Sequence, residues 1–72
     1  MNGERLVAMA NDIAAFFDSE PDKEIAAAQV AAHLKRYWEP RMRRDLVSVA
    51  SAGPVGLAPI AARAVELCAY TA

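Results

Sequence analysis

The sequence predicts an all-α fold, a small bundle of three to four short helices that forms a single domain over residues 1–72. Three observations lead to this prediction. Alanine is the most frequent residue, and it has the highest intrinsic helix preference. Apolar residues recur at intervals of three and four, which is the spacing of one helix face. Prolines and short polar stretches interrupt that pattern at three places, and each interruption separates two helices.

The first helix is predicted from about Glu4 to Phe17. Its larger apolar residues are expected to form one buried face: Leu6, Met9, Ile13, Phe16 and Phe17. Asp18, Ser19 and Pro21 then break the helical pattern. Ser19 and Asp22, three residues apart, have the spacing of a capping pair for the next helix.

The second helix is predicted to start near Pro21 and to continue to about Trp38. Acidic residues at positions 20, 22 and 24 suit the positive end of its dipole. Its apolar residues fall on two lines, Ile25, Ala28 and Ala32 on one and Ala27, Val30, Leu34, Tyr37 and Trp38 on the other. The many alanines would allow neighbouring helices to approach closely.

The third helix is predicted to begin at Pro40, because proline suits the first position of a helix and disfavours helical geometry at the preceding Glu39. The chain should therefore turn at this point. The buried stripe of the third helix is expected to consist of Met42, Leu46 and Val49, with Arg41, Arg43 and Arg44 largely on other faces.

A loop is predicted over residues 51–56, where Gly53, Pro54 and Gly56 break regular structure. Pro59 can open a fourth helix after it. The residues expected to share one face there are Leu57, Ile60, Ala64, Leu67 and Cys68.

Composition and charge narrow the class of function. A chain of 72 residues is near the lower size at which a hydrophobic core alone stabilises a fold, and a permanent partner would add stability by binding the folded state. The net charge of −1 argues against general attraction to nucleic acid or to anionic lipid. Acidic residues gather in the first third and basic residues in the middle. This distribution favours oriented docking, and the alternative is a pair of ordinary solvated faces.

The single cysteine, Cys68, excludes an internal disulfide and fits a reducing compartment. Its helical spacing among apolar residues indicates a buried structural thiol. No apolar stretch approaches the roughly 20 residues of a membrane span, and the amino terminus has no export-signal pattern. We therefore expect a cytoplasmic protein.

Catalytic chemistry is difficult to assemble from these residue types. His33 is the only histidine, and no spacing of histidine, cysteine and acids forms a metal site. The chain has no glycine-rich phosphate loop and no nucleophile motif. We expect no catalytic, cofactor-binding or metal-ligating residue, and no enzymatic activity of the chain by itself.

Residues 33–44 hold the only tryptophan and five of the eight basic residues. Rigid aromatic side chains beside guanidinium groups are typical of an anchor that docks into another macromolecule. One alternative is a helix-turn-helix nucleic-acid-binding module with Arg41, Arg43 and Arg44 facing phosphates. Another is that Tyr37 and Trp38 simply complete the core of an alanine-rich bundle.

Three blocks of the sequence resemble the delta subunit of bacterial NAD-dependent, molybdenum-containing formate dehydrogenase. They are residues 9–17, 32–43 and 56–65, and they have the order and spacing of that family. The most specific is residues 33–43, which read HLKRYWEPRMR. The resemblance implies a cofactor-free accessory subunit of a soluble enzyme complex that interconverts formate and carbon dioxide.

By the same resemblance, the chemistry belongs to other subunits. The alpha subunit would carry molybdopterin guanine dinucleotide and iron-sulfur clusters, and the beta and gamma subunits would carry FMN and further clusters and use NAD. The delta subunit would dock directly on alpha, without nucleic acid or membrane, and support assembly or stability of the complex. A maturation chaperone that leaves the finished enzyme is an alternative. The matching block nominates one interface: Arg36, Tyr37, Trp38, Arg41 and Arg43.

Overall fold

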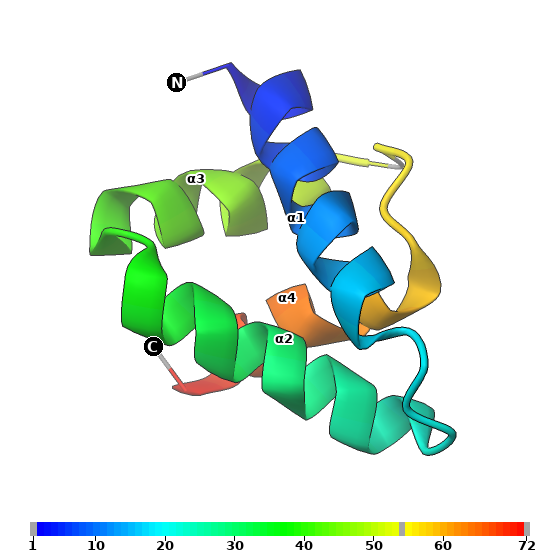
Figure 1. The fold of residues 1–72 in the computed structure, drawn as a ribbon. Coiled ribbons are helices and arrows are strands. Elements are labelled where there is room, and N and C mark those ends of the chain that lie inside the picture. The colour runs from blue at the N-terminus through cyan, green and yellow to red at the C-terminus, as the bar shows by residue number, and fades with distance from the viewer. Residues whose placement is uncertain (1, 54, 72) are drawn as a thin grey trace.

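The helices expected from the sequence are present, and their ends follow its prolines and polar residues. The computed structural model describes residues 2–53 and 55–71, with residues 70 and 71 described by their backbone alone. The helices are α1 (Gly3–Phe17), α2 (Lys23–Tyr37), α3 (Pro40–Ser51) and α4 (Pro59–Thr71) (Figure 1). No strand occurs in this part of the chain, which confirms the all-α prediction. Pro54, expected to break the loop, lies outside the described residues.

Helix α1 begins at the predicted place, and its buried face includes alanines that the sequence prediction left out. Asn2 caps it, because its side-chain oxygen accepts the Glu4 N–H at 2.8 Å. The buried residues are Leu6, Val7, Ala10 and Ala14, whereas Phe16 is 79% exposed. Of the predicted face, Leu6 is buried and Met9, Ile13 and Phe17 are half-buried against the core, so the prediction was wrong only for Phe16. Small alanines face the neighbouring helices, and the larger Met9, Ile13 and Phe17 cover the edge of the core.

The turn before α2 is capped by Asp22, and the predicted role of Ser19 in that cap was wrong. The Asp22 carboxylate accepts the N–H groups of Glu24 and Ile25 at 3.0 and 3.3 Å, so the helix starts at Lys23. The Lys23 ammonium group donates to the carbonyl oxygens of Asp18 and Glu20 at 2.7 and 3.1 Å. This lysine thereby binds the end of α1 to the start of α2.

Helix α2 buries one of its two predicted apolar lines. Ala27, Val30, Leu34 and Trp38 are buried, with Ala26 and Ala31 beside them. The other line, which begins at Ile25, faces solvent together with Ala28 and Ala32. Tyr37, expected on the buried line, is 66% exposed. Tyr37 is the last residue of α2, and its ring contacts that of His33 on the surface of the same helix.

Helices α3 and α4 start at the two predicted prolines. Pro40 occupies the first turn of α3, and Leu46 is buried while Met42 and Val49 pack at the edge of the core. Pro59 opens α4, and the buried residues of its predicted face are Ile60, Ala64 and Cys68. Leu57 and Leu67, also predicted for that face, are half-buried against the core.

Asn11 on α1 clamps the loop that leads into α4. Its side-chain amide donates to the Gly56 carbonyl oxygen at 2.9 Å, and its amide oxygen accepts the Ala58 N–H at 2.8 Å. Gly56 has a φ of 78°, a left-handed conformation that glycine adopts without steric cost. One side chain therefore fixes the entry to α4 from 45 residues away.

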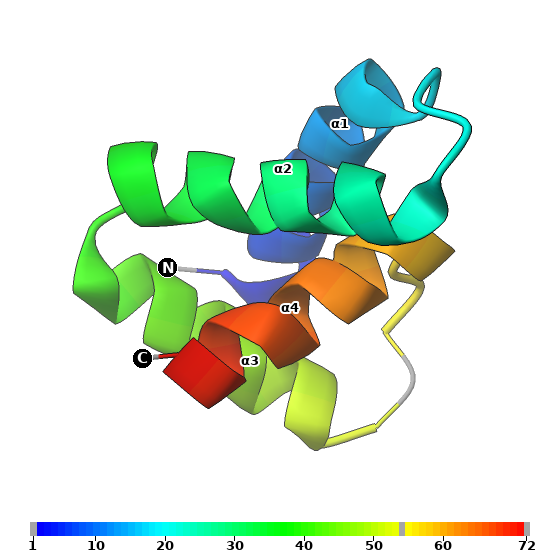
Figure 2. The ribbon, with the colours of Figure 1, turned by 90° about the horizontal axis from the view of Figure 1, so that it is seen from below.

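The helices enclose a core in which alanine is the commonest residue. Among the residues whose side chains the structure describes, sixteen are buried and seven of these are alanines, which allows close packing of helix backbones. The most extensive contact is between α2 and α4, which lie one over the other (Figure 2). At the far end of α1, a Cβ added to Gly3 would lie 2.9 Å from Cγ2 of Val49 on α3. Glycine at this position therefore permits the close approach of α1 and α3.

Candidate partner-binding surface

Trp38, predicted as the anchor for a partner, lies in the core of its own chain. It is 7% exposed, and its backbone N–H ends α2 by donating to the Leu34 carbonyl oxygen at 2.9 Å. The alternative, in which Trp38 completes the bundle core, fits this burial. The role of Trp38 as an anchor for a partner stays a prediction.

Arg43, also nominated for the interface, binds the carboxyl end of α2. Its Nη1 atom donates to the carbonyl oxygens of Trp38, Lys35 and Leu34 at 2.7, 3.2 and 3.4 Å. The last carbonyls of a helix lack partners within the helix, and a cation beside them also interacts favourably with the helix dipole. This arginine thus stabilises the corner between α2 and α3, a role that its sequence position did not reveal.

The other three nominated residues lie on the surface. Arg36, Tyr37 and Arg41 are exposed, and the guanidinium carbon of Arg36 lies 5.7 Å from the centre of the Tyr37 ring. This distance allows a cation–π interaction. Their contact with a partner stays a prediction, but their side chains are available for one.

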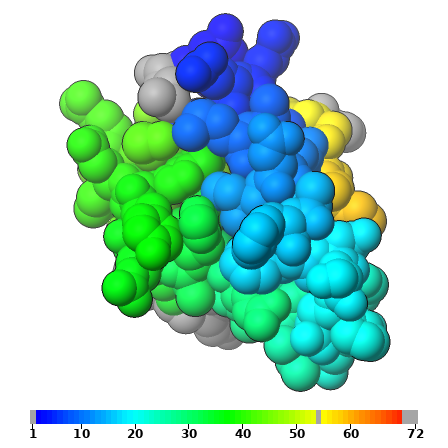
Figure 3. Space-filling model, viewed as in Figure 1, coloured from blue at the N-terminus to red at the C-terminus, as the bar shows by residue number. Residues whose placement is uncertain are grey.

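The structure adds two phenylalanines and the histidine to this surface. The rings of Phe16 and Phe17 stack edge to face with centres 5.1 Å apart, Phe17 lies 6.3 Å from His33, and His33 lies 4.7 Å from Tyr37. We call these four residues the aromatic row. It runs from the end of α1 onto α2 and then along α2 toward its carboxyl end, and the space-filling view shows that α1 and α2 are in contact (Figure 3).

Of this row, only Tyr37 was predicted from the sequence as part of a partner interface. His33 was not, although it lies four residues before Tyr37 on the same helix, a spacing that brings two side chains together. The contribution of Phe16 and Phe17 depends on how α1 is rotated, and their apolar character had placed both in the predicted core. His33 is half-buried between the rings of Phe17 and Tyr37.

A shallow hollow borders the aromatic row. Its volume is about 280 Å³, and the residues that line it are Asp12, Ile13, Phe16, Phe17 and His33. Roughly 300–1,000 Å³ is usual for a small-molecule site, so this hollow is better matched to one or two side chains of another protein.

The ion pairs of the described residues lie away from the α2–α3 corner. Arg63 binds the Glu24 carboxylate through two nitrogens, with distances of 2.7 and 3.0 Å to Oε1. The hydrogen bond from Arg63 lowers the pKa of Glu24, and the same contact raises the pKa of Arg63. By contrast, four exposed cations around the corner have no ion pair with any described residue: Lys35, Arg36, Arg41 and Arg44.

The described residues contain no group of three or more histidines, cysteines or acids that could hold a metal ion. Cys68 is buried, and burial raises the pKa of its thiol. The sulfur lies 4.0 Å from the Ala31 carbonyl oxygen, within reach of a weak hydrogen bond. Within residues 2–53 and 55–71, no helix combines the length and apolar character needed to cross a lipid bilayer.

Comparison with known proteins confirms the resemblance found in the sequence. The family model described as the NADH-dependent formate dehydrogenase delta subunit FdsD matches residues 5–65. No curated protein matches the chain, and no solved structure does. The matched segment includes α1 from Arg5 onward, all of α2 and α3, and the first half of α4. The chain therefore belongs to the FdsD family of formate dehydrogenase delta subunits.

Proposed function

We propose that this chain is a non-catalytic subunit of a soluble NAD-dependent formate dehydrogenase, that it docks directly on the catalytic alpha subunit, and that it supports assembly or stability of the complex. The family match over residues 5–65 is the observation that carries the proposal. Exposed cations without ion pairs and an exposed aromatic row supply surface groups suited to docking.

In this proposal the reacting groups belong to the other subunits. The alpha subunit would hold molybdopterin guanine dinucleotide and iron-sulfur clusters, and the beta and gamma subunits would hold FMN and further clusters and reduce NAD. We also propose a cytoplasmic location, because the single cysteine is an unpaired thiol and suits a reducing compartment.

The first test is recovery of the tagged chain from its own cells, followed by native mass spectrometry. We expect a stoichiometric complex with the alpha, beta and gamma subunits. Recovery with immature alpha alone would favour a maturation chaperone that dissociates later. Recovery with nucleic acid, or as a lone monomer, would contradict the proposed function.

The second test removes the chain from cells that produce the remaining subunits. We expect less assembled complex, or a shorter half-life of formate oxidation at elevated temperature, and recovery of both on re-expression of the chain. Molybdenum and iron content per alpha subunit would separate a defect in cofactor insertion from loss of the finished enzyme. Unchanged yield, metal content and half-life would contradict a role in assembly or stability.

A further inference from the structure

Two large side chains of the aromatic row are exposed to solvent. Phe16 is 79% exposed and Tyr37 is 66% exposed, although the same helices bury small alanines. Removal of apolar surface from water is favourable by about 25 cal/mol per Å². Exposed apolar side chains that adjoin one another are typical of surfaces that bind another protein.

The rings of the row are already ordered by contacts with one another. Phe16 rests against Phe17, which faces His33, and His33 contacts Tyr37. A partner that covers the row would therefore order few additional side chains, and the entropy cost of binding would be small. The hollow of about 280 Å³ beside Phe17 provides room for an apolar side chain of that partner.

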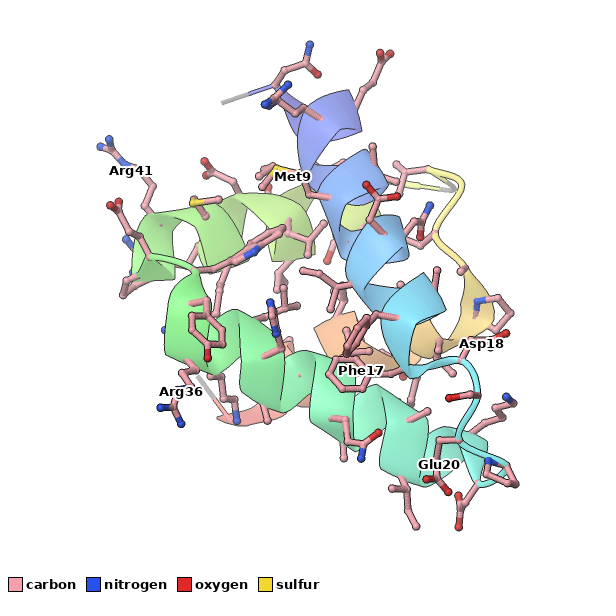
Figure 4. The ribbon with its side chains drawn as sticks, in the orientation of Figure 1. Met9, Phe17, Asp18, Glu20, Arg36 and Arg41 are labelled. Atoms are coloured by element: carbon pink, nitrogen blue, oxygen red, sulfur yellow. The ribbon has the colours of Figure 1, made fainter. Side chains whose placement is uncertain are left out.

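Charge is distributed unevenly around this face. Figure 4 shows Phe17 near its middle, Arg36 and Arg41 toward one side, and Asp18 and Glu20 at the opposite corner. Arg36 and Arg41 have no ion pair with any described residue, whereas Asp18 is paired with Lys23 at 3.5 Å. Positive charge without such an ion pair thus lies at the Tyr37 end, whereas the carboxylates of Asp12 and Glu20, which also have no ion pair with a described residue, lie beside the hollow and at the opposite corner.

We propose that the aromatic row and its hollow bind an acidic segment of another subunit of the formate dehydrogenase complex, and this inference rests on the function proposed above. The segment inserts an apolar side chain into the hollow beside Phe17, and its carboxylates lie against Arg36 and Arg41. A guanidinium group can bind a carboxylate through two parallel hydrogen bonds, which fixes orientation as well as strength.

A protein segment fits this face better than a nucleic acid does. Asp12 lines the hollow, and Asp18 and Glu20 stand at the far corner (Figure 4). An extended polyanion that crossed the row would approach these carboxylates, whereas a short protein segment can confine its negative charge to the Arg36 end.

The test measures the dissociation constant between the full chain and a complex of the other subunits purified without it. Two variants probe the face, the double variant Phe16→Ser with Tyr37→Ser and the single variant Arg36→Glu. We expect each to bind about 30-fold more weakly than wild type, which corresponds to loss of a binding hot spot. Binding of the wild-type chain should also weaken as salt is raised, because the charges involved are exposed.

Two matched controls keep the test specific. Ile25→Ser removes an apolar side chain that is 49% exposed, about two helical turns from His33. Arg5→Glu reverses an exposed charge at the opposite end of α1 from Phe16. Both controls should bind like wild type. Thermal melts of all variants would show that they fold, and a row variant that unfolds would be replaced by Tyr37→Ser alone.

The outcomes separate the inference from the proposed function. If wild type binds the complex, and the Phe16/Tyr37 double variant and the Arg36→Glu variant bind it equally well, the inference is wrong and the subunit assignment stands. If wild type does not bind the complex, the proposed function fails and the inference fails with it. The inference would also be overturned if the wild-type chain bound a single-stranded RNA probe more tightly than it binds the complex of the other subunits, and if the Phe16/Tyr37 and Arg36 variants lost that RNA binding.

Discussion

At the scale of single residues, Trp38 and Arg43 form one structural unit. The Trp38 ring lies in the core, and its carbonyl oxygen accepts the shortest of the three hydrogen bonds from Arg43. Both residues are thus engaged within the chain, although an aromatic ring beside arginines is also typical of an interface. Exposure distinguishes the two roles, and among their neighbours it leaves Arg36, Tyr37 and Arg41 available to a partner.

We predict that Trp38→Ala destabilises the fold by about 3–5 kcal/mol, because it removes a large core side chain and leaves a cavity. This is a large part of the roughly 5–15 kcal/mol that stabilises a typical domain. Urea denaturation followed by circular dichroism measures the change. Trp38→Phe should lose less, since it fills part of the same volume. Normal stability with lost partner binding would instead restore Trp38 to the interface.

At the scale of elements, the Asn11 clamp connects segments that are distant in the chain. Its two hydrogen bonds hold the backbone before α4 against the middle of α1. A loop of small residues has many alternative conformations, and the clamp selects the one from which Pro59 can begin α4. The placement of α4 against α2 therefore depends partly on a side chain of α1.

We predict that Asn11→Ala destabilises the protein by roughly 1–3 kcal/mol, because the Gly56 carbonyl and the Ala58 N–H both lose their partner. Thermal melts and hydrogen exchange of the Ala58 amide measure this effect. Asn11→Asp is the comparison variant, since it keeps the acceptor for Ala58 but replaces the donor to Gly56 with an oxygen that repels the Gly56 carbonyl. A melt of Asn11→Ala identical to wild type would contradict the role of the clamp.

The sequence predicts the helix boundaries better than it predicts the helix faces. Pro40, Pro59 and the acidic turn before α2 act locally, so their effect on the chain is readable without a tertiary fold. The buried face of α1 depends on which neighbours it meets. Ala10 and Ala14 let α1 pack closely, and this contact turned Phe16 outward. Size and apolar character alone had assigned Phe16 to the core.

In the candidate site, too, the local features could be predicted from the sequence and the contacts between helices could not. The block around residues 33–43 was readable because it is contiguous, and it gave the family as well as three exposed residues of the surface. The aromatic row joins α1 to α2. Its composition therefore required the packing angle between those helices, which no local pattern in the sequence specifies.

At the scale of the whole molecule, the burial of Cys68 makes the stability of the fold depend on pH. It is 5% exposed, and burial raises the pKa of its thiol. The folded state therefore keeps this proton at pH values where the unfolded chain has lost it. The resulting contribution to stability is complete below the ordinary pKa of 9.0 and is lost as the pH rises through the raised value of the folded state.

We predict that the free energy of unfolding of wild type falls above about pH 9 more steeply than that of Cys68→Ala, in which this proton is absent. Urea denaturation at a series of alkaline pH values measures both curves, and the difference between them isolates Cys68 from the other groups that titrate there. Alkylation of Cys68 should be slow in buffer and fast in denaturant. Parallel curves with rapid alkylation of the native protein would show that the thiol is accessible.

The contact between Gly3 and Val49 also affects how this sequence can vary. Alanine favours a helix over glycine by roughly 1 kcal/mol, yet position 3 of this alanine-rich chain is glycine, because a Cβ there would lie 2.9 Å from the valine. The two positions are therefore expected to change together, with a side chain at position 3 accompanied by a smaller residue at position 49. Each substitution would change the sign or size of the other's effect, which is pairwise epistasis between two helices.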